Sequence, residues 1–467
     1  MPDLEESFLL ASGLILFLAL GLLVHVYTKV GIGLFILLAA LSTNLRSPVT
    51  ATLTLGSLQV TALDLIAIIM LASGIFQALA QRSAGRQLWP LWLLVAIMLL
   101  NATRGLSKFG LQHTADELRS WLYLLAILVY SSIAAITDAA WWRRAATLYV
   151  CGLILVVLVG LSGTGLGAAT TRVQLDGQLV DPRPLTSFGA LVIADGLLFL
   201  VGRRLHRRGG SLMAIAVLVA SLVVLQQRTV WIATAIAGVY LGFLALRAGG
   251  RARLAAALGA ALAFVVVAAG FLTGAVQRSV VAVSAENITQ SDNTLTWRFD
   301  GWKDLLTKNF GTVQAVIGEP FGSGYSRTVN GVNVTVSPHS HYVEMFLRFG
   351  VIGSVAFVVL TVFAWRAAPA AAIRLNLDTG AIRAVLVALV VAGVTYRWDI
   401  MQGLVLGTIL GAAAPSTQVA APEPGGARRG QSRLPGLAGL PASVGAGLPN
   451  LTAARMRSGA NAHTERT

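Results

Sequence analysis

Long apolar runs recur along most of the 467-residue chain, separated by short polar gaps. Each run approaches the roughly 17–25 residues that an α-helix needs to cross a bilayer. Backbone N–H and C=O groups find no water partners in lipid, so such runs must be helical. The pattern predicts an all-α, polytopic transmembrane bundle of about 12–13 spans. The expected spans lie at about 8–27, 30–45, 62–80, 89–103, 121–137, 145–165, 186–202, 211–227, 230–246, 254–275, 342–364, 382–396 and 400–414.

Arginine clusters occupy alternate gaps between these runs. They comprise Arg82 and Arg86, Arg143 and Arg144, the group Arg203, Arg204, Arg207 and Arg208, the group Arg247, Arg251 and Arg253, and the pair Arg366 and Arg374. Basic residues favour the cytoplasmic side of a membrane, which places all these gaps in the cytoplasm. The opposite gaps are then extracytoplasmic, and the longest of them covers about 276–341.

The long gap at 276–341 has the composition of an ordered cap. It contains Trp297, Trp302 and a glycine-rich segment, GEPFGSGYSRTVNG, together with helix-compatible stretches. We therefore expect a large extracytoplasmic loop that carries short helices, within one membrane-embedded domain at 1–414. The tail at 415–467 is rich in Pro, Gly, Ala and Arg without apolar periodicity, so we expect it to be disordered and cytoplasmic.

Composition supports the membrane interpretation and excludes several function classes. Hydrophobic residues form 56% of the chain and charged residues 12%, too few charges to cover a soluble protein of this length. The net charge of +15 comes from clusters between apolar runs, which indicates topology signals and no nucleic-acid partner. No phosphate-binding Walker loop occurs, which argues against an ATP-driven motor.

Two arginines stand out because of their positions. Arg228, in LVVLQQRTVWIATAI, lies between two apolar runs with almost no loop around it. It is either a snorkelling side chain at a helix end or a group that lines a polar cavity. Arg298 precedes Trp302 by four residues, as in an amphipathic helix that either anchors at the membrane surface or binds substrate. The fork-shaped guanidinium of arginine suits a fixed grip on a diphosphate.

Two histidines, His339 and His341, come immediately before a predicted membrane helix. Imidazole is the usual side chain for proton transfer near neutral pH, although both residues could simply be polar helix-start residues. A His-x-His pair can also bind metal, but no Asp, Glu or Cys cluster accompanies this one, so we expect no metal and no cofactor. Glu344 could orient one imidazole. Asp195, inside an apolar run, is a functional candidate because buried charge is costly.

Three segments in this order resemble the O-antigen ligase and polymerase superfamily of bacterial glycan assembly. The first is Arg-Thr-x-Trp at 228–231, and the second is Arg298 with Trp302. The third runs from PFGSGY to the signature at 339–343, followed by Gly350 and Gly353. Here Ser340 and Val343 replace the usual Asn and Leu of that signature. The clear similarity covers about 220–360.

The resemblance implies an inverting, metal-independent glycosyltransferase in the bacterial plasma membrane. Its donor would be a glycan on a polyprenyl diphosphate such as undecaprenyl diphosphate. Its acceptor would be a glycan or lipid-borne glycan on the outer face, in O-antigen, capsule or exopolysaccharide assembly. The resemblance makes His339 the candidate base and Arg228 and Arg298 the catalytic arginines. The other residues expected to contact substrate are His341, Tyr342, Glu344 and Arg327.

Other functions remain open from the sequence. A transporter or flippase for lipid-linked glycans is also polytopic and also contacts diphosphates. A non-catalytic scaffold for envelope assembly is a third reading. The large loop with histidines at its end favours the enzyme. The motifs do not separate a ligase from a polymerase, because both classes break the same donor linkage and differ in the acceptor.

Overall fold

The computed structural model describes residues 18–44, 52–55, 58–80, 88–133, 139–164, 173–175, 178–180, 185–207, 212–225, 227–247, 294–329, 332–335 and 337–413. Three predicted features lie outside these ranges. They are the helix at 254–275, the first part of the long loop, and the tail at 415–467.

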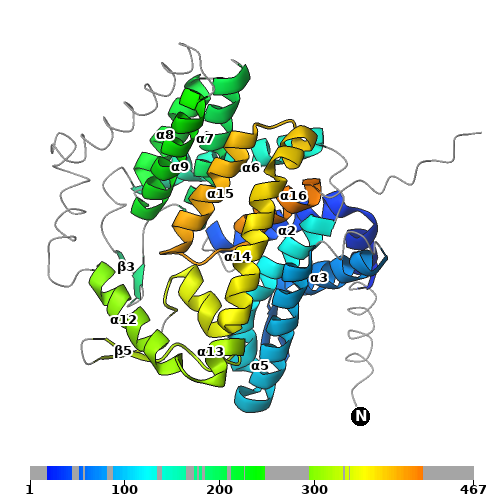
Figure 1. Ribbon diagram of the computed structural model, residues 1–467, viewed down its shortest axis with the longest axis vertical. Coiled ribbons are helices and arrows are strands. Elements are labelled where there is room, and N and C mark those ends of the chain that lie inside the picture. Colours follow the sequence, from blue (N-terminus) through cyan, green and yellow to red (C-terminus); the bar gives the residue numbers. More distant parts are fainter. Residues whose placement is uncertain are drawn as a thin grey trace, which may run out of the picture. The chain divides into compact units, whose positions relative to one another are not determined.

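The described residues form an all-α membrane protein, which confirms the predicted fold class (Figure 1). The helices are α2 (Thr28–Asn44), α3 (Ala62–Ala80), α5 (Trp89–Ile133), α6 (Ala139–Thr164), α7 (Ser187–Arg207), α8 (Leu212–Leu225), α9 (Arg228–Arg247), α12 (Thr294–Asn309), α13 (Val313–Ile317), α14 (His341–Leu375), α15 (Thr379–Gly393) and α16 (Ile400–Ala413). Most of them end within a few residues of the predicted spans, because apolar length decides where a membrane helix begins and ends.

Within the described ranges, four helices are long and apolar enough to cross a membrane. They are Ala62–Ala80, Trp89–Ile133, Thr229–Arg247 and His341–Leu375. The pair Leu18–Val26 and Thr28–Leu38, bent by 116°, could form a fifth span. Shorter apolar helices account for most of the remaining predicted runs. The total of about 12–13 spans stays a prediction.

Three short antiparallel hairpins occupy gaps between the helices. They are β1–β2 (Thr52–Leu55 and Leu58–Thr61), β3–β4 (Val173–Leu175 and Gln178–Val180) and β5–β6 (Arg327–Val329 and Val332–Val334). In the third hairpin, Arg327 lies opposite Val334. The hairpins fall in gaps that the charge pattern assigns to the extracytoplasmic side. The sequence analysis did not predict them, since strands of three or four residues show almost no alternation.

Helix α5 reverses direction at Gly110, which adopts φ 79° and ψ 176°. A Cβ built on Gly105 would lie 3.0 Å from the Thr114 side chain, whereas residues nine apart in a straight helix are separated by about 13 Å. The polar gap between the expected spans 89–103 and 121–137 is therefore helical on both sides of one glycine. Glycine is required there because other residues rarely adopt this backbone conformation.

The glycines of α16 allow it to lie directly against α5. Gly403, Gly407 and Gly411 are spaced by four residues and so share one face. A Cβ on any of them would lie only 2.6–2.7 Å from a backbone oxygen of α5. Those oxygens belong to Leu124, Leu128 and Ser131. Small residues at four-residue spacing permit this close backbone contact between membrane helices.

Helix α14 bends at Gly350, where the segment before it packs against α13. Gly350 has φ 63° and Gly318 has φ 87°. The backbones of the two segments touch, because a Cβ on Gly318 would lie 2.7 Å from the Phe349 nitrogen. Glu319 N donates a 2.7 Å hydrogen bond to Leu347 O. The glycine-rich loop is thereby fixed to the start of α14.

The first arm of α5 secures the same junction. The Asn101 side chain is fully buried and donates hydrogen bonds to Ile317 O at 2.7 Å and to Arg348 O at 2.8 Å. Arg104 donates a 3.0 Å hydrogen bond to Gly318 O. One amide thus holds carbonyls from two segments that are far apart in the sequence.

Arg348 is the centre of a buried charge network at this junction. Its guanidinium is fully buried and lies 2.7 Å from Glu117 and 3.3 Å from Glu319. Its carbon lies 4.4 Å from the centre of the Tyr325 ring. Glu117 also accepts 2.7 Å hydrogen bonds from Gly322 N and Gly324 N. Glu117 and Arg348 therefore both hold the turn of the glycine-rich loop in place.

We expect Gly350→Ala to destabilise the protein. The substituted residue would need a conformation that almost only glycine adopts, and its Cβ would meet Val316 O and lie 2.6 Å from Gly318 N. A loss of roughly 2 kcal/mol or more should lower the thermal unfolding midpoint in detergent. The matched control is Gly238→Ala in α9, where a Cβ meets nothing within 4 Å. Equal midpoints for the two variants would contradict the close packing at Gly350.

Arg348→Leu should lower the stability of the protein more than Gly350→Ala does. Removing the guanidinium leaves the carboxylates of Glu117 and Glu319 without their partner, a loss of about 3–5 kcal/mol for buried pairs. Arg374→Leu, in the last turn of the same helix, serves as control. Thermal unfolding followed by intrinsic fluorescence compares the two variants. A midpoint for Arg348→Leu at or above that of the control would show that the network contributes no stability.

Candidate functional site

The predicted site residues gather around the connection between α15 and α16, residues 394–399. Arg298 of α12 donates a 3.4 Å hydrogen bond to Thr395 O. The Thr395 hydroxyl donates a 2.8 Å hydrogen bond to the hydroxyl of Thr229, in the first turn of α9. Helix α9 begins at Arg228. Thr395 therefore joins two segments that the sequence analysis selected independently.

The corner before α9 is fixed by polar contacts of Gln227. This buried amide oxygen accepts hydrogen bonds from the Ser187 hydroxyl at 3.0 Å and from the Tyr396 hydroxyl at 3.2 Å. Trp231, one turn into α9, donates a 2.7 Å hydrogen bond to Leu222 O of α8. The backbone of Arg228 is thus held at a tight turn between α8 and α9, while its side chain is outside the described part.

Helix α12 links Arg298 to the peptide that precedes His339. Trp302 lies one turn after Arg298, so both side chains occupy the same face of the helix. Trp302 Nε1 donates a 2.7 Å hydrogen bond to Pro338 O. One face of α12 therefore contacts both the α15–α16 connection and the residue next to His339.

His339 is exposed and has a left-handed backbone, with φ 55°. Its N–H donates a 3.2 Å hydrogen bond to the Ser337 hydroxyl. Non-glycine residues in this region are uncommon, and they concentrate at functional sites. The turn places the imidazole outside the helix that starts two residues later.

The positive charges of three arginines act on the imidazole of His339. Loss of surrounding water, followed by the positive charges of Arg298, Arg327 and Arg397, lowers the pKa of His339 below its usual 6.5. Arg327 itself is 1% exposed, and burial lowers its pKa. A neutral imidazole beside several positive charges is an arrangement that can accept a proton and bind an anion.

Glu344 joins two sides of the site from the first turn of α14. Its carboxylate is fully buried. It accepts a short hydrogen bond from the Ser337 hydroxyl, and its other oxygen lies 3.4 Å from Arg397. The expected link to an imidazole is therefore indirect: Ser337 stands between Glu344 and the backbone of His339.

His341 is buried among aromatic side chains. Its ring is fully buried and stacks on Trp398, with ring centres 4.9 Å apart and planes 8° apart. Its Nδ1 accepts a 3.3 Å hydrogen bond from Trp398 N. In this arrangement the imidazole has no surface to offer a substrate. The neighbouring Tyr342 hydroxyl donates a 2.6 Å hydrogen bond to Val390 O of α15.

The sequence analysis missed Arg397. It lies in the short gap at 397–399 between two apolar runs, the same kind of position that singled out Arg228. Glu117, in the polar gap between the expected spans 89–103 and 121–137, was also not among the predicted residues. Arg397 could have been found from its position in the sequence, whereas nothing in the sequence links Glu117 to Arg348.

The two predicted intramembrane acids differ in their surroundings. Asp64 starts α3, where it accepts a hydrogen bond from Tyr123 at 2.6 Å and pairs with Arg119 at 3.2 Å. With Thr61 it forms a reciprocal cap of that helix. Asp195 is 4% exposed, and neither of its carboxyl oxygens has a hydrogen-bond partner among the described residues.

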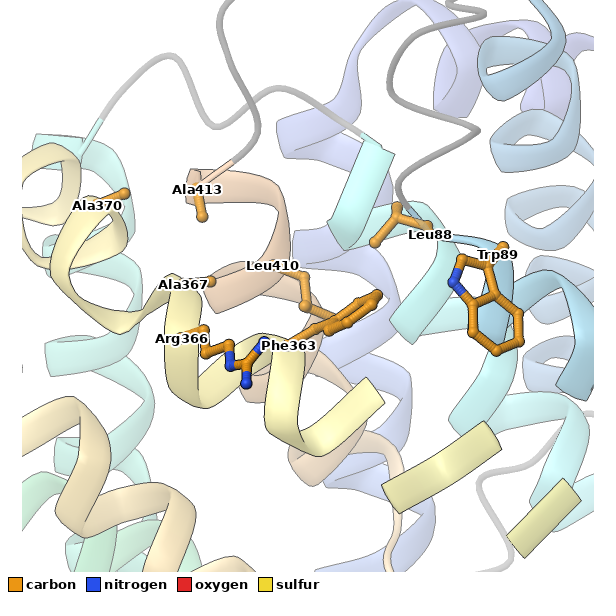
Figure 2. Close-up of a pocket in the computed structure, with 8 residues that line it drawn as sticks. All are labelled: Leu88, Trp89, Phe363, Arg366, Ala367, Ala370, Leu410 and Ala413. Atoms are coloured by element: carbon orange, nitrogen blue, oxygen red, sulfur yellow. The ribbon is translucent and has the colours of Figure 1, made fainter. Parts of the chain in front are cut away.

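An apolar cavity of about 490 Å³ lies near the far end of α14 from His339 (Figure 2). Its walls come from the start of α5, the second half of α14 and the end of α16. The lining residues are Leu88, Trp89, Phe363, Arg366, Ala367, Ala370, Leu410 and Ala413. Arg366 is the charged residue among them, and no histidine or acid is present. The cavity therefore offers no proton acceptor and contains none of the predicted site residues.

Residues 212–358 match the family model described as O-antigen ligase. The matched segment contains Arg228, Arg298, Arg327, His339 and Glu344, and it coincides closely with the region of 220–360 that carries the motifs. No curated protein matches the chain. The family match and the all-α membrane fold support the assignment of this chain to the O-antigen ligase and polymerase superfamily.

Proposed function

We propose that this protein is an inverting glycosyltransferase that takes glycan from a polyprenyl-diphosphate donor at the outer face of the bacterial plasma membrane. The observation that carries the proposal is that Thr395 contacts both Arg298 and the first turn of α9, while Trp302, on the same helix face as Arg298, contacts Pro338 next to His339. The positive charges of Arg298, Arg327 and Arg397 also act on His339. A neutral base surrounded by fixed cations suits a reaction in which an alcohol attacks and a diphosphate leaves.

The reaction follows from the charges. His339 accepts the proton of an acceptor hydroxyl as its oxygen attacks the anomeric carbon. The bond from that carbon to the phosphate oxygen breaks, and the electron pair leaves with the lipid diphosphate. Attack from the side opposite the leaving group inverts the anomeric configuration. We assign to Arg298 the binding of the departing charge; its buried Nε has no hydrogen-bond partner among the described residues, which supports this role.

The arginines supply the positive charge that divalent cations supply in many enzymes that act on diphosphates. Guanidinium forks bind phosphate oxygens in pairs, and their charge does not depend on pH in the working range. We therefore expect the reaction to need no metal ion. Arg228, at the start of α9 beside Thr229, is the second predicted phosphate ligand.

The helices next to the site carry a surface suited to lipid. Phe299, Phe310 and Val313 of the α12–α13 segment are 57–72% exposed. Phe299 directly follows Arg298, so an apolar and a cationic side chain project from adjacent positions. Exposed aromatic residues beside cations are typical of helices at a membrane surface. A polyprenyl chain could then remain in the bilayer while its diphosphate reaches the site.

We expect His339→Ala and Arg298→Ala to reduce glycan transfer by at least about 100-fold. Purified protein in lipid vesicles would receive a polyprenyl-diphosphate oligosaccharide, with and without an acceptor, in the presence of EDTA. Gel electrophoresis and mass spectrometry would detect products, with Arg374→Ala as control. A ladder from donor alone would indicate a polymerase, and a single transfer to added acceptor a ligase.

Full transfer by both site variants would refute the assigned roles. Movement of the donor across the vesicle membrane without a new glycosidic bond would instead identify a transporter or flippase. Association with envelope proteins, with no change in glycan in the variants, would identify a scaffold.

The pH dependence of kcat/KM should follow His339. The base must be neutral, and the environment lowers its pKa below 6.5. The base is protonated and inactive at low pH, so the acidic limb of the kcat/KM profile should be centred below pH 6.5, the ordinary histidine pKa. The measurement is the initial rate at low donor concentration across buffers of constant ionic strength. An acidic limb centred above pH 6.5 would contradict the proposed base in this environment.

A further inference from the structure

We propose that Arg397 is a further diphosphate-binding residue, held in place by Glu344. This inference rests on the proposed function and extends it to a residue outside the segment that matches the family model. It starts from geometry: Arg397 lies in the α15–α16 connection, whose neighbouring residue Thr395 already contacts Arg298. It is also one of the three guanidiniums whose charge acts on His339.

The backbone beside Arg397 is rigidly held. Trp398 N donates to His341, and the Trp398 ring stacks on that imidazole. Trp398 Nε1 donates a 3.0 Å hydrogen bond to Leu389 O of α15. On the other side, Tyr396 donates to Gln227. A guanidinium on such a segment is aimed by its backbone, so little conformational freedom is lost when it binds a ligand.

The guanidinium of Arg397 contacts a buried acid, while the side chain as a whole is partly exposed. Its Nη1 lies 3.4 Å from a carboxylate oxygen of the fully buried Glu344, while 32% of the side chain is exposed. Strong pairs between guanidinium and carboxylate use two parallel hydrogen bonds of about 2.7–2.9 Å. A single longer contact fixes the orientation of the guanidinium and leaves N–H groups directed elsewhere. Glu344 is itself oriented by the Ser337 hydroxyl.

The charge balance favours an anionic ligand. The charges of Arg298, Arg327 and Arg397 act together on His339, while the acids Glu344 and Asp399 act on Arg397. A surplus of fixed positive charge in a partly enclosed site attracts anions. The negative charge on a diphosphate increases when its bond to the sugar breaks. A guanidinium already held by Glu344 can bind that charge without reorganisation.

A second explanation gives Arg397 a purely structural role as the counter-ion of the buried Glu344. Two substitutions separate the explanations. Arg397→Gln removes the guanidinium and leaves Glu344 unpaired, whereas the double variant Glu344→Gln with Arg397→Gln removes both charges and keeps two amides of similar shape. A structural role predicts recovery in the double variant, because an unpaired buried charge is the main cost in that case. A ligand role predicts no recovery.

The experiment measures binding of undecaprenyl diphosphate to purified protein in detergent, by scintillation proximity with a radiolabelled lipid. We expect Arg397→Gln to weaken binding at least about tenfold, with the double variant equally weak. Arg397→Lys, which keeps the charge beside Glu344 but lacks the fork, should bind with intermediate affinity. Arg374→Gln is the control. Thermal unfolding confirms that each variant is folded.

Wild-type affinity in Arg397→Gln, or recovery in the double variant, would overturn the inference. If Arg397→Gln fails to fold, Arg397→Lys provides the test instead. Wild-type affinity in the lysine variant would contradict a role for the guanidinium fork. Because binding is measured without turnover, the outcome is separate from that of the proposed function. If wild-type protein binds the lipid but forms no glycosidic bond, the enzyme assignment is wrong. The binding data from the Arg397 variants would still decide whether Arg397 binds the diphosphate.

Discussion

The fully buried guanidinium of Arg348 must be neutralised by nearby carboxylates, and much of the structure around the site follows from how the chain meets that requirement. Glu117 comes from the α5 hairpin and Glu319 from the glycine-rich segment. The reversal of α5 at Gly110 and the bend of α14 at Gly350 lie beside these contacts. A buried pair contributes little net stability by itself, but it penalises every arrangement that separates its members.

The same junction positions the residues of the candidate site. Once the glycine-rich segment is fixed to α14, the chain leads through the β5–β6 hairpin, which carries Arg327, to His339 at the start of α14. Helix α12 approaches from the other side through Arg298 and Trp302. Packing among distant segments therefore sets the geometry of the charged cluster, while the membrane helices supply the support.

Apolar length and composition were sufficient to predict the fold class and the ends of helices such as α3. They did not predict the helical hairpin in the polar gap between the expected spans 89–103 and 121–137, where Glu117 and Arg104 make polar contacts. Motif spacing selected Arg228, Arg298 and His339; the segments of Arg228 and Arg298 meet at Thr395, and Trp302 of α12 contacts Pro338, next to His339. The different environments of His339 and His341 were not predictable, because the stacking of His341 depends on Trp398 from a distant segment.

The α15–α16 connection has a consequence for how the family can vary. Four consecutive residues, from Thr395 to Trp398, each contact a different partner: the hydroxyl of Thr229, the amide of Gln227, the carboxylate of Glu344 and the imidazole of His341. Connections between helices usually tolerate changes of length. Here the insertion or deletion of one residue would put every one of these contacts out of register. Natural selection should therefore hold this short connection at constant length even where the sequences of the two helices that it joins diverge.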